Sequence, residues 1–158
     1  KQLIFNLFFI TYIFSFCSIF FIFSSFLHLK LILFLLIIIC ITSDIGGFVF
    51  GKIFKGKKLT KISPNKTISG SIGSFIFSLC LIPFFYEDLI VYSFLNLTLI
   101  TLLISLITQL GDLFISFLKR KAKVEDTSDI LPGHGGFLDR VDGIIFAIPI
   151  GILLFGIF

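Results

Sequence analysis

Methionine is absent from this chain and cysteine is scarce. The 158 residues begin with lysine and contain no methionine. We therefore expect a fragment or trimmed version of a longer protein, lacking N-terminal helices. Cys17, Cys40 and Cys80 all lie inside apolar runs. Their spacing matches neither a metal site nor a disulfide framework, so we expect small buried hydrophobic residues.

Charge is also scarce. Charged residues make up 14% of the chain and hydrophobic ones 57%, whereas soluble domains average about 25% charged residues. Residues 2–27 and 89–111 carry no formal charge, and roughly 20 apolar residues span a bilayer. In lipid only helices and closed barrels satisfy the backbone, and these runs lack the alternating polarity of barrel strands. The sequence predicts an all-α integral membrane protein, a polytopic bundle.

The apolar runs predict a single membrane domain over residues 1–158, with about five transmembrane helices. Two of the loops between them, 52–67 and 119–142, are strongly basic, and with Lys1 they place twelve of the thirteen Lys and Arg residues on one side. The positive-inside rule makes that side cytoplasmic. The predicted spans are about 2–27, 31–51, 68–86, 89–118 and 143–158.

The segment 116–142 concentrates the polar chemistry, with five of the nine acidic and five of the thirteen basic residues. Asp112 and Ser116 are four apart on a predicted helix, and Asp139 and Asp142 are three apart, so each pair shares a face. Three carboxylates and a hydroxyl at the ends of spans indicate a site for Mg²⁺. Alternatively, Asp139 and Asp142 cap the last helix, and Asp112 marks a helix end at the interface.

Polar groups also occur upstream. Asp44 lies in an apolar run, where an acid costs roughly 2.5–3.5 kcal/mol to insert and usually faces a cavity or a partner. Lys66, with Ser63 and Thr67, precedes a span. These residues can bind a phosphate at the helix N-terminus, or the lysine-rich loop can serve as a basic membrane anchor. We assign Gly47-x-x-x-Gly51 to close helix packing.

Residues 132–136, Pro-Gly-His-Gly-Gly, form a predicted tight loop. The backbone N–H groups of Gly135 and Gly136 can turn toward a phosphate, although a simple turn would explain the glycines equally well. His134 can donate to a phosphate or take part in proton transfer, and its alternative role is structural.

Over residues 43–145 these motifs resemble the C-terminal catalytic half of the phosphatidate cytidylyltransferases (CDP-diacylglycerol synthases). Ser43-Asp44 through Gly51 is similar to the family's D-x-G-A-Y-x-x-G segment, and residues 62–67 to its I-S-P-K-K-T loop. Gly111-Asp112 is similar to its G-D-L-x-x-S start. The long signature of the family is matched by Ser116, Lys119, Arg120, Asp126, Ser128, Leu131, Pro132, His134, Gly135, Gly136, Asp139, Arg140 and Asp142.

The resemblance implies that CTP and phosphatidic acid are converted to CDP-diacylglycerol and pyrophosphate. It implies a Mg²⁺ site on Asp112, Asp139 and Asp142 with help from Ser116, and room for a second, monovalent or divalent cation. It also implies a homodimer in the bacterial inner membrane, with the active site facing the cytoplasm. The catalytic set would be Asp112, Asp139, Asp142 and His134, and the substrate-binding set Asp44, Ser63, Lys66, Thr67, Lys119, Arg120, Gly135, Gly136 and Arg140.

The chain departs from the family pattern at two positions. Glu125 stands where lysine is usual, which would weaken a triphosphate contact, and Ser69 stands where glutamate is usual, which would remove a ligand or an acceptor. Alternative functions are a CTP-dependent lipid-alcohol kinase, a transporter with Asp44 and Asp112 as ion ligands, or a catalytically silent fragment. Topology and nucleotide binding explain the basic residues, so we expect no nucleic-acid partner.

Overall fold

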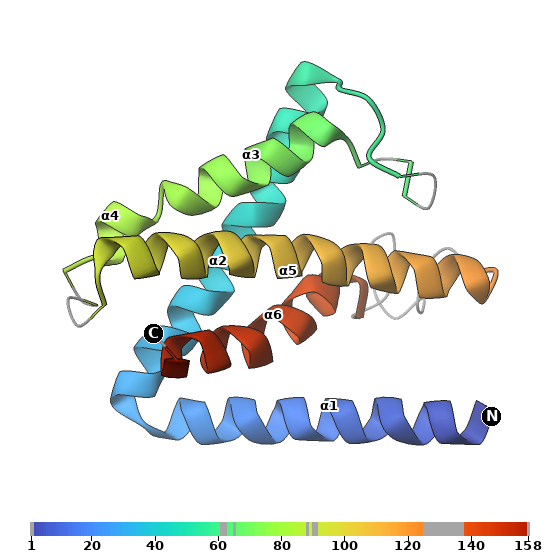
Figure 1. Ribbon diagram of the computed structural model, residues 1–158. Helices are drawn as coiled ribbons and strands as arrows, with labels where there is room; N and C mark the ends of the chain where they lie inside the picture. The colour runs from blue at the N-terminus through green and yellow to red at the C-terminus, as the bar shows by residue number, and fades with distance from the viewer. Residues whose placement is uncertain are drawn as a thin grey trace.

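The computed structural model of the chain is helical (Figure 1). It describes residues 2–60, 63–64, 66–87, 89, 92–124 and 138–157. Among these residues no strand forms, and an isolated antiparallel bridge joins Lys58 to Thr67. The all-α prediction is confirmed. The helices are α1 (Gln2–Ser25), α2 (Leu27–Phe54), α3 (Ile68–Leu79), α4 (Ile82–Phe85), α5 (Phe94–Lys121) and α6 (Leu138–Ile157).

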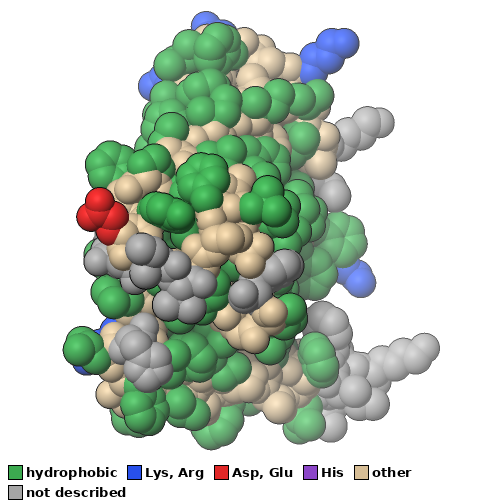
Figure 2. All heavy atoms as spheres, turned by 60° about the vertical axis from the view of Figure 1, so that its left-hand side comes forward, with side chains coloured by type: hydrophobic (Ala, Val, Ile, Leu, Met, Phe, Trp, Pro, Cys, Tyr) green, Lys and Arg blue, Asp and Glu red, His purple; other side chains and the backbone are tan. Residues whose placement is uncertain are grey.

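Several helical segments have the length and composition of membrane spans. Hydrophobic side chains cover most of the face shown in Figure 2, and on α1 Phe8 and Phe14 are 70% and 73% exposed. Apolar surface on this scale faces lipid rather than water. The prediction of a polytopic membrane protein with about five helices is confirmed. Within the described residues, four segments are long and apolar enough to cross a membrane, Asn6–Ser25, Leu29–Phe54, Ile68–Phe85 and Phe94–Lys121, and Val141–Ile157 is a shorter apolar helix.

Local chemistry sets several helix boundaries. Helix α3 begins after Thr67, whose hydroxyl accepts a hydrogen bond from the Gly70 N–H at 3.1 Å. Helix α5 begins after Ser93, which accepts from the Asn96 N–H at 3.2 Å. Both are N-caps, which satisfy an N–H group that has no partner within its helix. The apolar run 68–86 is divided into α3 and α4, and α4 carries a proline in its first turn, where the missing N–H matters least.

Glycines allow α2 and α3 to pack closely. A Cβ atom on Gly46 would lie 2.5 Å from the carbonyl oxygen of Gly73. A Cβ on Gly47 would lie 2.8 Å from Oγ of Ser74 on α3. A Cβ on Gly51 would lie 3.1 Å from Oγ1 of Thr67, the residue that caps α3. The prediction that Gly47 and Gly51 serve close helix packing is confirmed.

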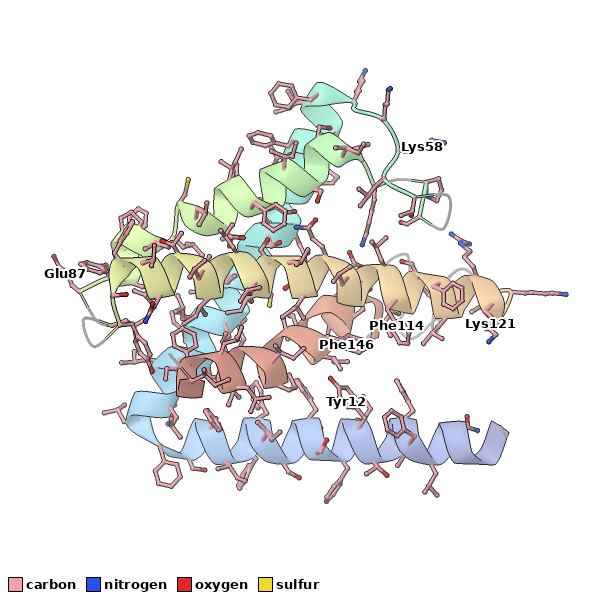
Figure 3. All side chains as sticks on the ribbon, in the orientation of Figure 1. Tyr12, Lys58, Glu87, Phe114, Lys121 and Phe146 are labelled. Carbon is pink, nitrogen blue, oxygen red and sulfur yellow. The ribbon has the colours of Figure 1, made fainter. Side chains whose placement is uncertain are left out.

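Helices α2, α5 and α6 share the core, and α1 attaches to its outside. The Tyr12 hydroxyl on α1 donates to the carbonyl of Ile145 on α6 at 2.8 Å. The ring of Phe146 lies between those of Tyr12 and Phe114, at centroid distances of 5.8 and 5.6 Å, and so links α1, α6 and α5 (Figure 3). The largest fully buried apolar side chains of the core are Leu36, Ile39, Ile100, Ile104 and Ile148.

The described parts of the two basic segments lie on one side of the bundle. Figure 3 shows Lys58, in the loop after α2, and Lys121, at the end of α5, on the same side, with Glu87 on the opposite side. The loop before α3 and the C-terminal end of α5 therefore lie on the same side, and Lys66 of that loop contacts Asp112 of α5. The candidate site lies near this end.

Candidate functional site

A cavity of about 280 Å³ lies between α2, α3, α5 and the loop that precedes α3. Eight of its twelve lining residues have polar side chains. Three charged side chains, Asp44, Lys66 and Asp112, contribute to the lining. The uncharged polar side chains of the lining are Ser63, Thr67, Ser71, Ser74 and Gln109.

The loop before α3 holds Lys66 in place through its own backbone. The N–H of Leu59 donates to the carbonyl of Lys66 at 2.8 Å, and the N–H of Lys66 donates to the carbonyl of Ser63 at 3.2 Å. Together with the Thr67 cap, these bonds fix the backbone on both sides of the lysine. The Nζ atom of Lys66 forms a hydrogen-bonded ion pair with the Asp112 carboxylate on α5.

Ser69 also supports this loop. Its hydroxyl accepts from the Gly56 N–H at 3.2 Å and lies 3.1 Å from the hydroxyl of Thr67. A Cβ atom on Gly56 would lie only 2.6 Å from the Ser69 oxygen. In this chain, position 69 therefore closes the loop on α3, where the family pattern led us to expect a glutamate.

Asp142, near the start of α6, joins Asp112 because α5 and α6 approach closely. The residue is 8% exposed, its side chain accepts from the N–H of Gly143 at 2.9 Å, and it interacts electrostatically with the Asp112 carboxyl. A Cβ atom on Gly143 would lie 2.7 Å from the Thr108 methyl, and one on Gly111 would lie 3.3 Å from the Asp142 carbonyl. Glycines next to both aspartates thus allow the two carboxyl groups to meet.

Asp44 lies on the cavity wall formed by α2. Although it sits inside an apolar helix, its side chain is accessible through the cavity, and it interacts electrostatically with both Asp112 and Lys66. The expectation that an acid in this apolar run faces a cavity or a partner is confirmed. The cavity therefore collects two acidic side chains and one basic one from three separate segments of the chain.

Several predicted site residues lie away from this cavity or outside the described residues. Ser116 is half-buried one turn after Asp112, and Lys119 and Arg120 lie in the last turn of α5; none of the three lines the cavity. The loop with His134, Gly135, Gly136 and Glu125, and the side chains of Asp139 and Arg140, lie outside the described residues.

In the described part of the chain, no three His, Cys, Asp or Glu side chains form a group that could hold a metal ion. Asp112 and Asp142 interact electrostatically, and the predicted third carboxylate, that of Asp139, is not among the described side chains. Oxygen ligands of this kind suit Mg²⁺, which is usually bound through one or two carboxylates together with substrate phosphates. The described donors are therefore compatible with that mode of binding.

The sequence analysis missed an uncharged part of the site. Ser71 and Gln109 line the cavity and are hydrogen-bonded to each other across α3 and α5. The signal was present, since an amide side chain in the apolar run 89–111 requires a polar partner. Which helix would supply that partner depends on packing and was not visible in the sequence.

Comparison with known proteins places these features in a family. A family profile described as "Cytidylyltransferase family" matches residues 1–158 of this chain. The phosphatidate cytidylyltransferase of Helicobacter pylori strain J99 is 39% identical over 121 residues, 76% of this chain and 46% of that protein. The phosphatidate cytidylyltransferase of Staphylococcus haemolyticus is 42% identical over 125 residues, 77% of this chain and 47% of that protein. That of Bacillus subtilis is 41% identical over 119 residues, 74% of this chain and 44% of that protein.

The chain thus spans about half the length of the curated relatives it matches. The match includes the described cavity with Asp44, Lys66 and Asp112. The resemblance first drawn from the motifs is confirmed at the level of the family. On the whole-chain profile match and these identities, the chain belongs to the cytidylyltransferase family.

Proposed function

We propose that this site transfers the cytidylyl group of CTP to phosphatidic acid, giving CDP-diacylglycerol and pyrophosphate. One observation carries the proposal. A cavity with two carboxylates and a lysine lies at the basic end of apolar helices, where a water-soluble nucleotide and a membrane lipid can meet. The relatives named above are phosphatidate cytidylyltransferases, which supports the same reaction.

The reaction exchanges one phosphoanhydride bond for another. An oxygen of the lipid phosphate attacks the α-phosphorus of CTP, and a new P–O bond forms as the bond from that phosphorus to the bridging oxygen of the β-phosphate breaks. Pyrophosphate leaves with the electron pair. The protein need not supply a nucleophile, so its task is to position the two phosphates and to stabilise their negative charge.

The described residues suit that task. Lys66 carries a fixed positive charge beside the cavity and would bind a phosphate of CTP. Asp112 and Asp142, with Ser116 and Asp139, would hold Mg²⁺, which when bound neutralises charge on the phosphates. We also retain a second cation in the proposal.

The remaining predicted residues complete the proposed site. Ser63 and Thr67 flank Lys66 on the cavity lining and would donate to phosphate oxygens, and Asp44 would help to bind substrate from α2. His134 would donate to a phosphate or transfer a proton. Further contacts to the phosphates would come from Lys119, Arg120, Gly135, Gly136 and Arg140.

We propose the bacterial inner membrane as the location, with the basic segments and the cavity on the cytoplasmic side. The predicted spans would cross the bilayer as a single membrane domain. We also propose a second copy of the chain as a partner, on the family resemblance alone. The mass of the purified protein in detergent would decide between a monomer and a dimer.

The proposed reaction can be tested with purified protein in detergent, radiolabelled CTP, dioleoyl phosphatidic acid and Mg²⁺. Both CDP-lipid and pyrophosphate would be measured, for the wild type and for Asp112→Asn. Glu87→Gln is the matched control, because Glu87 lies on the opposite side of the bundle (Figure 3). We expect CDP-diacylglycerol and pyrophosphate in equal amounts from the wild type and the control, and neither from Asp112→Asn. Release of CDP on a lipid alcohol would instead establish the kinase.

A further inference from the structure

A row of uncharged polar side chains connects three helices behind the charged part of the cavity. The hydroxyl groups of Ser43 on α2 and Ser105 on α5 are hydrogen-bonded at 2.9 Å. Gln109, one turn further along α5, donates through Nε2 to Ser105 Oγ at 3.5 Å, the outer limit for such a bond. Its Oε1 accepts a hydrogen bond from the Ser71 hydroxyl on α3. The row therefore runs from α2 through α5 to α3.

The row adjoins each charged group of the cavity. Ser43 directly precedes Asp44 in the sequence, and Gln109 lies three residues before Asp112, on the same face of α5. Ser71 is in the first turn of α3, and its N–H donates to the carbonyl of Thr67 at 3.0 Å. Thr67 is the residue that follows Lys66 in the sequence. A shift in the row would therefore move the supports of both carboxylates and of the lysine.

The hydroxyl groups of this row are bonded between helices rather than to carbonyls of their own helix. Hydroxyl groups within helices can be satisfied by a carbonyl of their own helix, as they are at Ser78, bonded to the Ser74 carbonyl at 2.8 Å, and at Thr98, bonded to Phe94. Ser43 and Ser105 are both completely buried, yet they bond between helices. At the other end of the row, Ser71 and Gln109 line the cavity itself.

We propose that Gln109 is a positioning residue for the reaction. Held between Ser71 and Ser105, it sets the separation of α2, α3 and α5 at the cavity, and so the placement of Asp44, Lys66 and Asp112 around the substrate. This inference rests on the proposed function, since it assigns a residue to the same site. It adds an uncharged residue, distinct from the charged groups that bind phosphate or metal.

The test compares two serine substitutions on α3, one at the half-buried Ser71 and one at the buried Ser78. Ser71→Ala removes the bond to Gln109, whereas Ser78→Ala removes only a bond within α3 and serves as the matched control. For both variants, kcat and KM for CTP would be measured in detergent with phosphatidic acid and Mg²⁺, beside the midpoint of thermal unfolding. We expect Ser71→Ala to lower kcat about ten- to a hundredfold with KM little changed, because small displacements of reacting groups have effects of that size. Ser78→Ala should match the wild type.

Two further variants separate positioning from folding. Ser71→Thr keeps the hydroxyl and should restore most of kcat. Gln109→Leu should lower kcat as Ser71→Ala does, and the double variant should be no worse than Gln109→Leu, because both changes remove one shared interaction. If Gln109→Leu does not fold, the comparison of Ser71→Ala, Ser71→Thr and Ser78→Ala alone tests the inference.

The inference is overturned if the wild type is active but Ser71→Ala behaves like Ser78→Ala, or if kcat falls only in proportion to the unfolding midpoint. Multiplicative losses in the double variant would also overturn it, because they would show independent effects. A wild-type protein that folds but transfers no cytidylyl group would overturn the proposed function and this inference together. The activity of the wild type therefore distinguishes a failure of this inference alone from a failure of the proposed function.

Discussion

Lys66 and Asp112, 46 residues apart in the sequence, form an ion pair at the edge of the cavity. Their side chains are 25% and 29% exposed, so the pair is neither fully solvated nor closed off. Asp142 approaches the same carboxyl from α6. The lysine is thus the counter-ion of a carboxylate that the proposed function assigns to a metal ion.

Replacing Lys66 by methionine should strengthen metal binding while it weakens catalysis. An ammonium group and a divalent cation compete for the same carboxylate, so we expect the Kd for Mn²⁺ without nucleotide to fall roughly three- to thirtyfold. Electron paramagnetic resonance of free Mn²⁺ measures that Kd directly. In the same variant, kcat/KM for CTP should drop, because a phosphate ligand is lost.

Lys58→Met controls for the change in net charge, since Lys58 lies in the same loop but outside the cavity. We expect its affinity for Mn²⁺ to remain near that of the wild type. Equal affinities in Lys66→Met and Lys58→Met would show that Lys66 and the metal do not share Asp112.

Asp142→Asn should abolish most activity and leave the fold intact. The asparagine oxygen can still accept from the Gly143 N–H, but one of the carboxyl groups proposed to hold Mg²⁺ is lost. We expect kcat to fall about a hundredfold or more, in the range seen when one stabilising group is removed from an active site. Asp142→Ala, which also loses the acceptor, should be less stable than Asp142→Asn in thermal unfolding. Near-normal turnover by Asp142→Asn would remove this residue from the catalytic set.

Gly143→Ala should destabilise the contact between α5 and α6. The added methyl group would lie 2.7 Å from Cγ2 and 3.0 Å from the carbonyl oxygen of Thr108, so the helices must separate. We expect a loss of about 1–3 kcal/mol in the free energy of unfolding, together with lower activity as Asp142 moves away from Asp112. Gly156→Ala, on the same helix, has no atom within 4 Å of the new methyl group and should unfold like the wild type. Equal midpoints for the two variants would contradict the close packing.

Thr67→Ala should separate the effect of a helix cap on stability from its effect on activity. Loss of the bond from the Gly70 N–H should lower stability by about 1 kcal/mol and should reduce kcat/KM, because Lys66 is the neighbouring residue. Ser93→Ala removes the equivalent cap of α5, and Ser93 does not line the cavity. We expect a similar change in unfolding midpoint for both variants and a loss of activity for Thr67→Ala alone. Equal activities would show that the cap does not position Lys66.

Much of the protein could be predicted from local sequence features. The uncharged runs are longer than a bilayer requires, and in lipid a helix satisfies its own backbone hydrogen bonds. These runs therefore predicted an α-helical membrane bundle. The acid at position 44 indicated a cavity or a partner, because lipid does not tolerate an isolated carboxylate. The motifs around Asp112 and residues 116–142 indicated the family, since their residue types and spacings are unusually specific.

The contacts of the site, in contrast, depend on how the helices pack. Helical periodicity places Asp112 and Gln109 on one face of α5. It does not specify that Lys66 contacts Asp112 or that Ser71 contacts Gln109. The pairing of Asp142 with Asp112 requires that α6 approach α5 at two glycines, and a glycine in a sequence does not reveal its neighbour. Local propensity therefore specifies the helices and their polar faces, whereas the relative placement of the charged groups follows from side-chain shape at the interfaces between helices.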